Sequence, residues 1–436
     1  KNSNVTDESQ PKPEITVWTK DRHDMEFWTK KIEEFNESNE YNIMVRYQVF
    51  SENYTQAVSN ALNTSNAPDL IAYTNQVFIQ GMDSYADIMP YMDEDFKETF
   101  SQAMIDNVNV IDGRCYYIPT AATTCRLFYN KTIFEKAGIE KAPETMEELI
   151  EDAMLITDKL SNQGIYGFGI NFKNAESALN RSLMKQGNSQ LGLKGGFDFS
   201  TGQFDFVSYE SLIEKWRILL SSECAYPECD ALDIDPLRKL FAAGKVGMYM
   251  SYSHSEFGAY LNQYPMKDEW ACVGIPTEYG MTKGAQNYTL NNGYLFNSSS
   301  TNLEEAWIVY RNIFANVNNL KEYYRQGLGV SIIEEVVSDT EYNDMLAEHG
   351  YYSVSDKEKM WPSTPLENGA NDFSVDGLSQ YETLKQLILG TQQIHDALCD
   401  LTERYNRAYN NALNRQNAER IFIEDFNPYN PGEANE

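Results

Sequence analysis

Short apolar runs alternate with amphipathic helical patterns in the first part of the chain. Residues 15–18 are an apolar strand, and apolar side chains then recur three and four positions apart over residues 28–35. Residues 43–49 alternate as a half-buried strand, residues 54–62 carry a second helical face, and residues 68–73 form the next strand. This order of strands and helices predicts a parallel sheet with helices on its faces.

The pattern begins again further along the chain. Residues 116–119 are expected to be extended, and residues 126–129 to form a strand. A capping box at residues 145–148 opens an amphipathic helix, and a long helical region is expected over about 381–414. The sequence therefore predicts two sheets, divided near residues 120–126.

The ends of the predicted strands are the places to look for a binding site. In an open parallel sheet, ligands bind beyond the carboxyl ends of the strands. We therefore examined the segments that follow four strands: 19–23, 51–54, 73–76 and 172–174.

Length and charge restrict the classes of function. A chain of 436 residues, 42% of them apolar, is too long for one ordinary core and suits two lobes. Its 35 basic and 65 acidic residues give a formal net charge of −30. Such a charge repels phosphate backbones and anionic lipid surfaces, so we expect no nucleic-acid partner. Neutral ligands are unaffected by it.

The cysteines and the amino-terminal segment restrict the possible functions less than length and charge do. The six cysteines form no CxxC pair and are accompanied by only four histidines, so no zinc site is expected. Cys224 and Cys229 flank a turn that allows either a disulfide or two free thiols. No apolar run approaches the ~20 residues of a membrane span. Residues 1–13 are polar and are interpreted as a flexible tether. A processed secretory or lipoprotein precursor would have such a segment, and so would a chain trimmed at that point.

Several segments carry motifs in a recognisable order. They include a small-residue-Pro-Asp sequence before a strand, a Tyr-Ile-Pro and Phe-Tyr-Asn-Lys series, and a Gly-Lys-Val-Gly-Met turn. The segments are Asn66–Leu70, Asp87–Asp93, Gly113–Thr145, Phe241–Met248, Ala271–Pro276 and Glu305–Trp307. Together they resemble the extracellular solute-binding proteins that feed ATP-driven oligosaccharide importers, the maltose-binding-protein-like family.

The resemblance implies a fold and a function. The fold is α/β and two-lobed, of the type II periplasmic-binding-protein kind, with a ligand cleft between lobes that are discontinuous in sequence. We expect lobe 1 to comprise residues 14–122 and about 292–340, and lobe 2 residues 123–291 and about 341–425, with a tail over 426–436. The implied function is capture of a neutral oligosaccharide by hinge closure, without cofactor, metal or catalysis, and delivery to the permease subunits of an ABC importer.

The resemblance also implies a location and an assembly state. We expect a monomer at the extracellular face of the cytoplasmic membrane, lipid-anchored through a removed or absent N-terminal Cys; a periplasmic location is the alternative.

Candidate ligand contacts follow from strand ends and from the family pattern. Sugars stack their C–H faces on aromatic rings and bond their hydroxyls to amides and carboxylates. The chain offers aromatic, amide, carboxylate, hydroxyl and imidazole groups at strand ends and hinge positions, and Trp361 in an irregular segment where the family commonly has a stacking aromatic. They are Trp18, Asp21, Glu52, Tyr73, Asn75, Gln76, Thr123, Phe172, Asn174, Tyr252, His254, Asn292 and Trp361.

Three other functions remain open on the sequence alone. A glycan-active enzyme is one, although no GxSxG, HExxH or phosphate loop is present. A ferric-ion-binding protein is another, with tyrosine pairs as ligands: Tyr116-Tyr117, Tyr323-Tyr324 and Tyr351-Tyr352. The third is a ligand-sensing subunit on the same fold. Asp230, Asp233 and Asp235 lack the spacing of a calcium loop and are interpreted as a solvated acidic turn.

Overall fold

The chain folds into two compact units, each built from separate stretches of sequence. The structure is a computed structural model that describes residues 11–350, 354, 357–368 and 373–432. Unit 1 comprises residues 1–121 and 290–342, and unit 2 comprises residues 122–289 and 343–436. The chain crosses between them after Ala121, Thr289 and Tyr342. The lobe boundaries that the family resemblance implies fall after residues 122, 291 and about 340.

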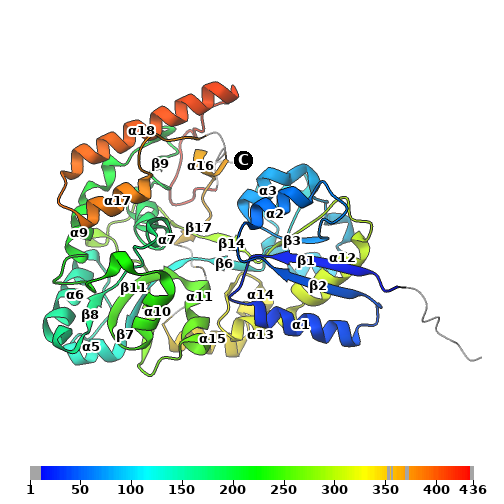
Figure 1. The fold of residues 1–436 in the computed structure, drawn as a ribbon, viewed down its shortest axis with the longest axis horizontal. Helices are drawn as coiled ribbons and strands as arrows, with labels where there is room; N and C mark the ends of the chain where they lie inside the picture. Colours follow the sequence, from blue (N-terminus) through cyan, green and yellow to red (C-terminus); the bar gives the residue numbers. More distant parts are fainter. Residues whose placement is uncertain (1–10, 351–353, 355–356, 369–372, 433–436) are drawn as a thin grey trace, which may run out of the picture. The chain divides into compact units, whose positions relative to one another are not determined.

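Unit 1 contains the parallel sheet that the amino-terminal pattern predicts. Its strands lie in the order β15-β3-β1-β2, with β1 parallel to both β2 and β3 and β15 antiparallel to β3. Figure 1 shows α2 and α3 on one side of this sheet and α1 on the other. The main elements are β1 (Glu14–Thr19), α1 (Met25–Ser38), β2 (Met44–Val49), α2 (Tyr54–Ala61), β3 (Leu70–Ala72), α3 (Asn75–Gly81), α4 (Glu94–Thr99), β15 (Tyr294–Phe296), α12 (Leu303–Val309) and α13 (Val317–Arg325). The alternation of strand and helix expected over residues 15–73 is thus confirmed.

Aromatic rings fill the space between the unit 1 sheet and its helices. Trp28 on α1 stacks on Tyr323 of α13, with centroids 5.3 Å apart, and also contacts Phe314. On the other side, Phe78 of α3 lies 5.6 Å from Tyr117 in an edge-to-face contact. Much of the chain's aromatic content is therefore used in packing rather than left on the surface.

Unit 2 is built on a mixed sheet. Its order is β12-β7-β11-β8, in which β11 is parallel to β8 and antiparallel to β7. The main elements are β7 (Cys125–Asn130), α5 (Lys131–Ala137), α6 (Met146–Leu160), β8 (Tyr166–Phe168), α7 (Ala175–Asn180), α8 (Leu183–Gln186), α9 (Glu210–Leu219), α10 (Ile234–Ala242), β11 (Val246–Tyr252), α11 (Ser253–Gly258), β12 (Trp270–Val273), β13 (Gln286–Asn287), β17 (Glu358–Lys359), α16 (Pro365–Asn368), α17 (Gln380–Leu389) and α18 (Ile394–Gln416).

The two faces of the unit 2 sheet are covered differently. Met248 and Met250 on one face join a continuous apolar core with α6, α9, α17 and α18. Tyr249 on the other face packs against Phe241 of α10, with centroids 5.0 Å apart. Helix α6 approaches the sheet closely at Gly167, where a Cβ atom would lie 2.2 Å from the Ala153 carbonyl oxygen. No larger side chain fits there without moving the helix.

Two predictions from local sequence, the capping box at residues 145–148 and the helical region over 381–414, are only partly confirmed. The capping box at α6 is confirmed in part, because Thr145 Oγ1 accepts from the Glu148 amide at 3.2 Å while the Glu148 carboxylate bonds the Glu144 amide instead. The long carboxyl-terminal helix predicted over 381–414 is two helices, α17 and α18. Gly390 interrupts them, and Gln393 caps the second by accepting from the Asp396 amide.

The structure decides one alternative that the sequence leaves open and differs from one expectation. Cys224 and Cys229 are both free thiols, so the turn between them forms no disulfide. Residues 426–432, which were set apart as a tail, belong to unit 2, because Phe426 packs on its core and Pro428 O accepts from the Ala285 amide at 2.8 Å. Residues 1–10 of the predicted tether lie outside the described residues.

A buried ion pair fastens β17 inside unit 2. Arg126 on β7 and Glu358 on β17 are 5% and 4% exposed, and Arg126 Nη2 lies 3.0 Å from Glu358 Oε2. Thr124 Oγ1 donates to the same carboxylate and accepts from Gln286 Nε2 at 3.0 Å. The carboxylate is thus satisfied on both oxygens, which is the condition under which burying a charge pair is tolerated.

Removing one partner of this pair should destabilise unit 2. We expect Glu358→Gln to lower the free energy of unfolding by about 3 kcal/mol, because Arg126 would remain buried without a counter-charge. The double variant Arg126→Met with Glu358→Leu should recover most of that loss, since it leaves no unpaired charge. Urea unfolding followed by circular dichroism measures both. Equal losses in the single and double variants would contradict the account.

Asp152 lies in α6 near two other acidic residues, Glu148 and Glu151. Burial, and then repulsion from Glu148 and Glu151, raises the pKa of the Asp152 carboxyl to about 7. The folded state therefore binds a proton that the unfolded state releases near its ordinary pKa of 3.8. Stability is lost as the pH rises from about 4 to about 7, and the full loss persists above 7.

Asp152→Asn should therefore stabilise the protein most at pH 8. We expect a gain of about 1 kcal/mol there, a value reduced for the solvent exposure of the side chain, and a smaller gain toward pH 4. Urea unfolding at several pH values measures it. Asp158→Asn, an exposed acid on the same helix, is the matched control. A gain that is the same at pH 4.5 and 8 would show that the Asp152 charge is not its source.

Candidate functional site

The carboxyl ends of the three parallel strands of unit 1 lie at one edge of its sheet. Thr19 at the end of β1 is paired with Val49 at the end of β2, and the Phe50 amide donates to Thr19 O at 2.8 Å. At the end of β3, the Tyr73 amide donates to Gly293 O at 2.9 Å. This register places the residues predicted after β1, β2 and β3, and Asn292 before β15, at the same edge: Asp21, Glu52, Tyr73, Asn75, Gln76 and Asn292.

Tyr73 is the best-defined aromatic group at this edge. Its ring lies parallel to that of Tyr117, with centroids 4.1 Å apart and an angle of 19° between the planes. Tyr117 is buried, and burial raises the pKa of its hydroxyl well above its usual range. Tyr73 itself is half-buried, so a ring supported on one face still presents surface to solvent. The sequence does not indicate a role for Tyr117 in the sugar site, because its support of Tyr73 depends on contact between distant segments.

Trp18 and the polar residues at this edge differ in their exposure. Trp18 is half-buried against Phe50, with centroids 4.7 Å apart. Asp21 is half-buried and pairs with Lys20 at 3.2 Å, and Glu52 is exposed. Asn75 and Gln76 lie in the first turn of α3, which Thr74 caps.

Asn292 belongs to a buried hydrogen-bond network beneath this edge. Its Nδ2 donates to Tyr323 Oη at 3.1 Å, and that hydroxyl donates to Asp24 Oδ2 at 2.8 Å. Asp24 is 3% exposed and also accepts from Trp28 Nε1 at 3.1 Å. Burial raises the pKa of the Asp24 carboxyl. The network fixes the backbone at Asn292, whose φ is +62°, so a structural role accounts for its amide.

The same topological argument applies within unit 2. Because β8 and β11 are parallel, the residues that follow them lie at one edge of the sheet, beside the start of antiparallel β7. Tyr252 at the end of β11 is half-buried, and burial raises the pKa of its hydroxyl. Asn174 is exposed and caps α7 by accepting from the Ser177 amide at 3.0 Å. These two predicted residues are therefore at the edge.

An arginine that sequence reasoning missed lies against Tyr252. The guanidinium carbon of Arg181 is 4.7 Å from the centroid of the Tyr252 ring. Arg181 Nε donates to Ser251 Oγ at 3.2 Å, and Nη1 donates to Ser177 O at 3.0 Å. These bonds hold the cation over one face of the ring. Nothing in the local pattern around residue 181 indicates this contact.

Other predicted residues of unit 2 are poor candidates for ligand contact. Phe172 is 0% exposed and lies in the apolar core, so its expected role as a ligand contact is corrected to packing. Trp361 is 7% exposed, and its Nε1 donates to Ala285 O at 2.9 Å, so both its ring and its N–H are largely used inside the unit. Thr123 on β6 (Ala121–Thr123) is buried at 6% exposure. His254 lies in α11, and its side chain is outside what the structure describes.

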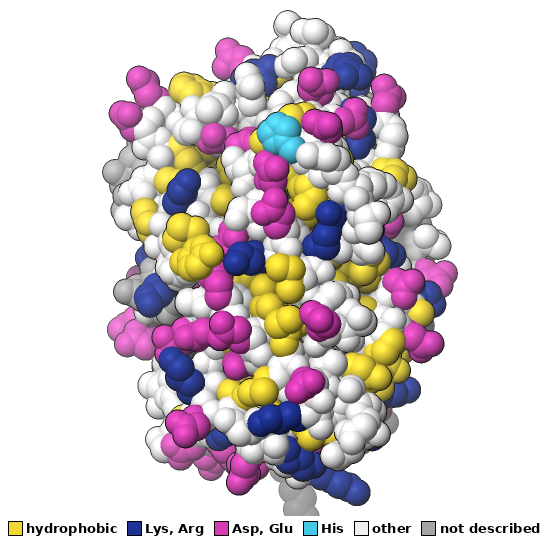
Figure 2. Space-filling view, turned by 90° about the vertical axis from the view of Figure 1, so that its left-hand side faces the viewer, with side chains coloured by type: hydrophobic (Ala, Val, Ile, Leu, Met, Phe, Trp, Pro, Cys, Tyr) yellow, Lys and Arg dark blue, Asp and Glu magenta, His cyan; other side chains and the backbone are white. Residues whose placement is uncertain are grey.

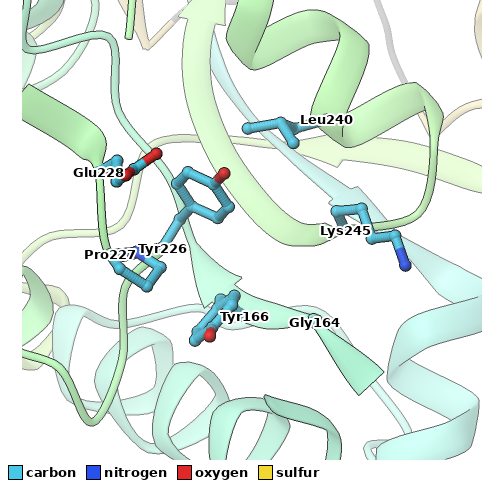
Figure 3. Close-up of a pocket in the computed structure, with 7 residues that line it drawn as sticks. All are labelled: Gly164, Tyr166, Tyr226, Pro227, Glu228, Leu240 and Lys245. Carbon is cyan, nitrogen blue, oxygen red and sulfur yellow. The ribbon is translucent and has the colours of Figure 1, made fainter. Parts of the chain in front are cut away.

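A separate hollow of about 480 Å³ lies at the opposite edge of the unit 2 sheet (Figure 3). It is found where β8 and β11 begin, and two tyrosines, Tyr166 and Tyr226, meet in it edge to face with centroids 5.7 Å apart. The lining residues are Gly164, Tyr166, Tyr226, Pro227, Glu228, Leu240 and Lys245. None of the predicted contacts is among them.

The geometry weighs against a ferric-ion site built from the tyrosine pairs. Tyr323 donates to Asp24, and Tyr324 donates to the Thr120 carbonyl. Burial raises the pKa of both hydroxyls, which opposes the phenolate form that binds iron. Tyr351 and Tyr352 lie outside the described residues. Within the described part of the chain, no three His, Cys, Asp or Glu side chains are grouped closely enough to hold a metal ion.

The surface and the helices of the described residues add two observations. On the face drawn in Figure 2, acidic side chains are interspersed with basic ones, and hydrophobic groups are spread over the face. Among the residues that the structure describes, no helix has the length and apolar character needed to cross a membrane.

Known structures share this fold at low sequence identity. One is the cyclic alpha-maltosyl-1,6-maltose binding protein of Arthrobacter globiformis, with a TM-score of 0.67 and 18% identity over 92% of this chain and 100% of that one. Another is the solute-binding protein RafE in complex with raffinose, with a TM-score of 0.70 and 18% identity over 91% of this chain and 99% of that one. Both likenesses establish the two-lobed α/β fold of solute-binding proteins.

Sequence comparison identifies a relative and the family of the chain, in addition to the fold. A binding protein of Brucella abortus (strain 2308) is 27% identical over 255 residues, which span 56% of this chain and 56% of that protein. The match therefore covers little more than half the length of this relative. The family described as bacterial extracellular solute-binding protein matches residues 19–308, more than half of the chain. The chain belongs to the bacterial extracellular solute-binding proteins.

Proposed function

We propose that this protein captures a neutral oligosaccharide outside the cell and delivers it to the permease subunits of an ABC importer. The observation that carries the proposal lies at the edge of the unit 1 sheet where the parallel strands end. There the ring of Tyr73 stacks on Tyr117 among carboxylate and amide side chains. A supported aromatic ring matches the C–H face of a pyranose, and amides and carboxylates match its hydroxyls. Proteins of the same fold are named for, or complexed with, a cyclic maltosyl-maltose and raffinose.

The proposed contacts are a subset of those expected from the sequence. In unit 1 they are Trp18, Asp21, Glu52, Tyr73, Asn75 and Gln76, and in unit 2 they are Asn174 and Tyr252, to which we add Arg181. Phe172 is left out because it is fully buried, and Asn292 because its amide serves the network around Asp24. His254, Thr123 and Trp361 remain secondary proposals. The proposal also includes closure of the two lobes on the sugar and a monomeric state. It places the protein at the extracellular face of the cytoplasmic membrane through a lipid anchor, with a periplasmic location as the alternative.

Removing the Tyr73 ring should weaken sugar binding without unfolding the protein. We expect Tyr73→Ala to reduce affinity ten- to a hundredfold, or ~1–3 kcal/mol, because the stacking surface is removed. Tyr73→Phe keeps the ring and its contact with Tyr117, and should retain most of the affinity. Calorimetry against the best oligosaccharide from a glycan array is the measurement.

The control for this experiment is an aromatic side chain away from the edge. Tyr41 is exposed and precedes β2, so it lies toward the opposite end of that strand. Tyr41→Ala should leave affinity unchanged. If Tyr73→Ala binds as tightly as the parent protein while remaining folded, Tyr73 is not part of the site.

The charge of the ligand is tested by salt dependence. Stacking and hydrogen bonds to uncharged hydroxyls are weakly screened, so affinity should be on the order of micromolar and nearly equal at low and high salt. Arg181 is the residue that would respond to an acidic sugar. Calorimetry with neutral and acidic oligosaccharides at two salt concentrations separates the cases. Tight, salt-sensitive binding of an acidic glycan that is lost in Arg181→Met would overturn the neutral assignment.

A further inference from the structure

Three titratable side chains outside the proposed sugar site form a hydrogen-bonded series on unit 2. His395 Nδ1 lies 2.9 Å from Glu210 Oε2, and His395 Nε2 lies 3.6 Å from Cys399 Sγ. His395 and Cys399 are one turn apart on α18, and Glu210 opens α9, which packs against α18. With Nδ1–H directed at the carboxylate, Nε2 is left to exchange a proton with the thiol. Cys399 is thus arranged as a nucleophile, His395 as its base and Glu210 as the group that orients the base.

Cys399 differs from the other cysteines of the chain in its surroundings. The other five are buried, and burial raises the pKa of each thiol to between about 11 and 12: Cys115, Cys125, Cys224, Cys229 and Cys272. Cys399 is half-buried, and the side chain of its partner His395 is 49% exposed. A dissolved reagent can therefore reach Cys399 while the buried thiols are shielded and held in the unreactive neutral form.

The charges around the pair act in both directions. The hydrogen bond and charge of Glu210, and then the charge of Asp396, raise the pKa of His395, which favours an imidazolium beside the sulfur. An imidazolium stabilises a thiolate, whereas carboxylates on the same helix oppose it. The charges that act on His395 are those of Glu210 on α9 and Asp396 on α18. Further charged residues on the same two helices are Glu214 and Arg217 of α9 and Asp400 and Glu403 of α18. Reactivity should therefore depend on His395 in particular.

We propose that Cys399 is a reactive thiol that forms mixed disulfides with small disulfide compounds, with His395 as its proton acceptor and Glu210 as a positioning residue. The thiol proton passes to His395 Nε2, and the sulfur attacks one sulfur of the incoming disulfide. A new S–S bond to Cys399 forms as the old S–S bond breaks, and the leaving thiolate takes the proton back from the imidazolium. The incoming disulfide is the oxidant, so nothing further is needed. The site is independent of sugar binding.

The test uses the full chain under native conditions with glutathione disulfide as the probe. Peptide mapping by mass spectrometry should find modification at Cys399, reversed by a reducing agent, and none at the five buried cysteines. His395→Asn should slow the reaction about tenfold at pH 7, because the thiol loses its proton acceptor. The difference should shrink as the pH rises, because hydroxide in solution then takes the proton instead.

Two carboxylate variants separate orientation of the imidazole from general charge. Glu210→Gln should slow the reaction about threefold, because the imidazole loses its acceptor and its added basicity. Glu403→Gln removes a negative charge one turn beyond Cys399 on the same helix, so it should leave the rate unchanged or raise it. Modification that is as fast in His395→Asn as in the parent, or rates that change in the same direction in both carboxylate variants, would overturn the proposal. Circular dichroism verifies that each variant is folded, and the two glutamate variants decide the outcome if His395→Asn is not.

Discussion

The parallel pairing of strands is the constraint from which the proposed site follows. Parallel strands must be joined by crossovers, and in unit 1 helices α1 and α2 make these connections between β1, β2 and β3. The crossover returns each strand to the same starting edge, so all carboxyl ends meet at the other edge. Residues far apart in sequence, such as Trp18 and Tyr73, are thereby brought to the same edge of the sheet. Unit 2 repeats the arrangement with β8 and β11.

This constraint also explains how much could be predicted. Strand and helix periodicity over residues 15–73 reflects burial on one or both faces of an element, and that information is local. The amino-terminal cap at Thr145 is local too, and it was found. The break at Gly390 was not, because apolar spacing continues across it and one glycine is compatible with a helix. The division near residues 120–126 was predicted from the restart of the strand and helix pattern. The two later crossings came from family resemblance, since no periodic pattern encodes them.

The candidate site shows where local information ends. The end of a strand can be located from the sequence, but whether the next ring is covered depends on segments elsewhere. Phe172 follows β8 as Tyr73 follows β3, yet Phe172 is fully buried while Tyr73 remains half-buried. Trp361 is likewise held by Ala285 and packs against Phe199 and Phe426. Arg181 could not be found from the sequence, because its contact with Tyr252 depends on the position of the residue that follows α7 beside Ser251 at the end of β11.

Tyr73 and Tyr252, two of the half-buried rings among the proposed contacts, share one property. Tyr73 is backed by Tyr117, and Tyr252 is backed by Arg181, so each ring is fixed on one face before any ligand arrives. A side chain that is already immobilised loses little conformational entropy on binding, and more of its contact energy is available as affinity. Since the aromatic residues of the chain pack mostly in the cores, a ring at a strand end serves a ligand only where the fold supports it from behind. Trp18 at the end of β1 has the same kind of support from Phe50, so support from behind, rather than aromatic content, is what the proposed aromatic contacts have in common.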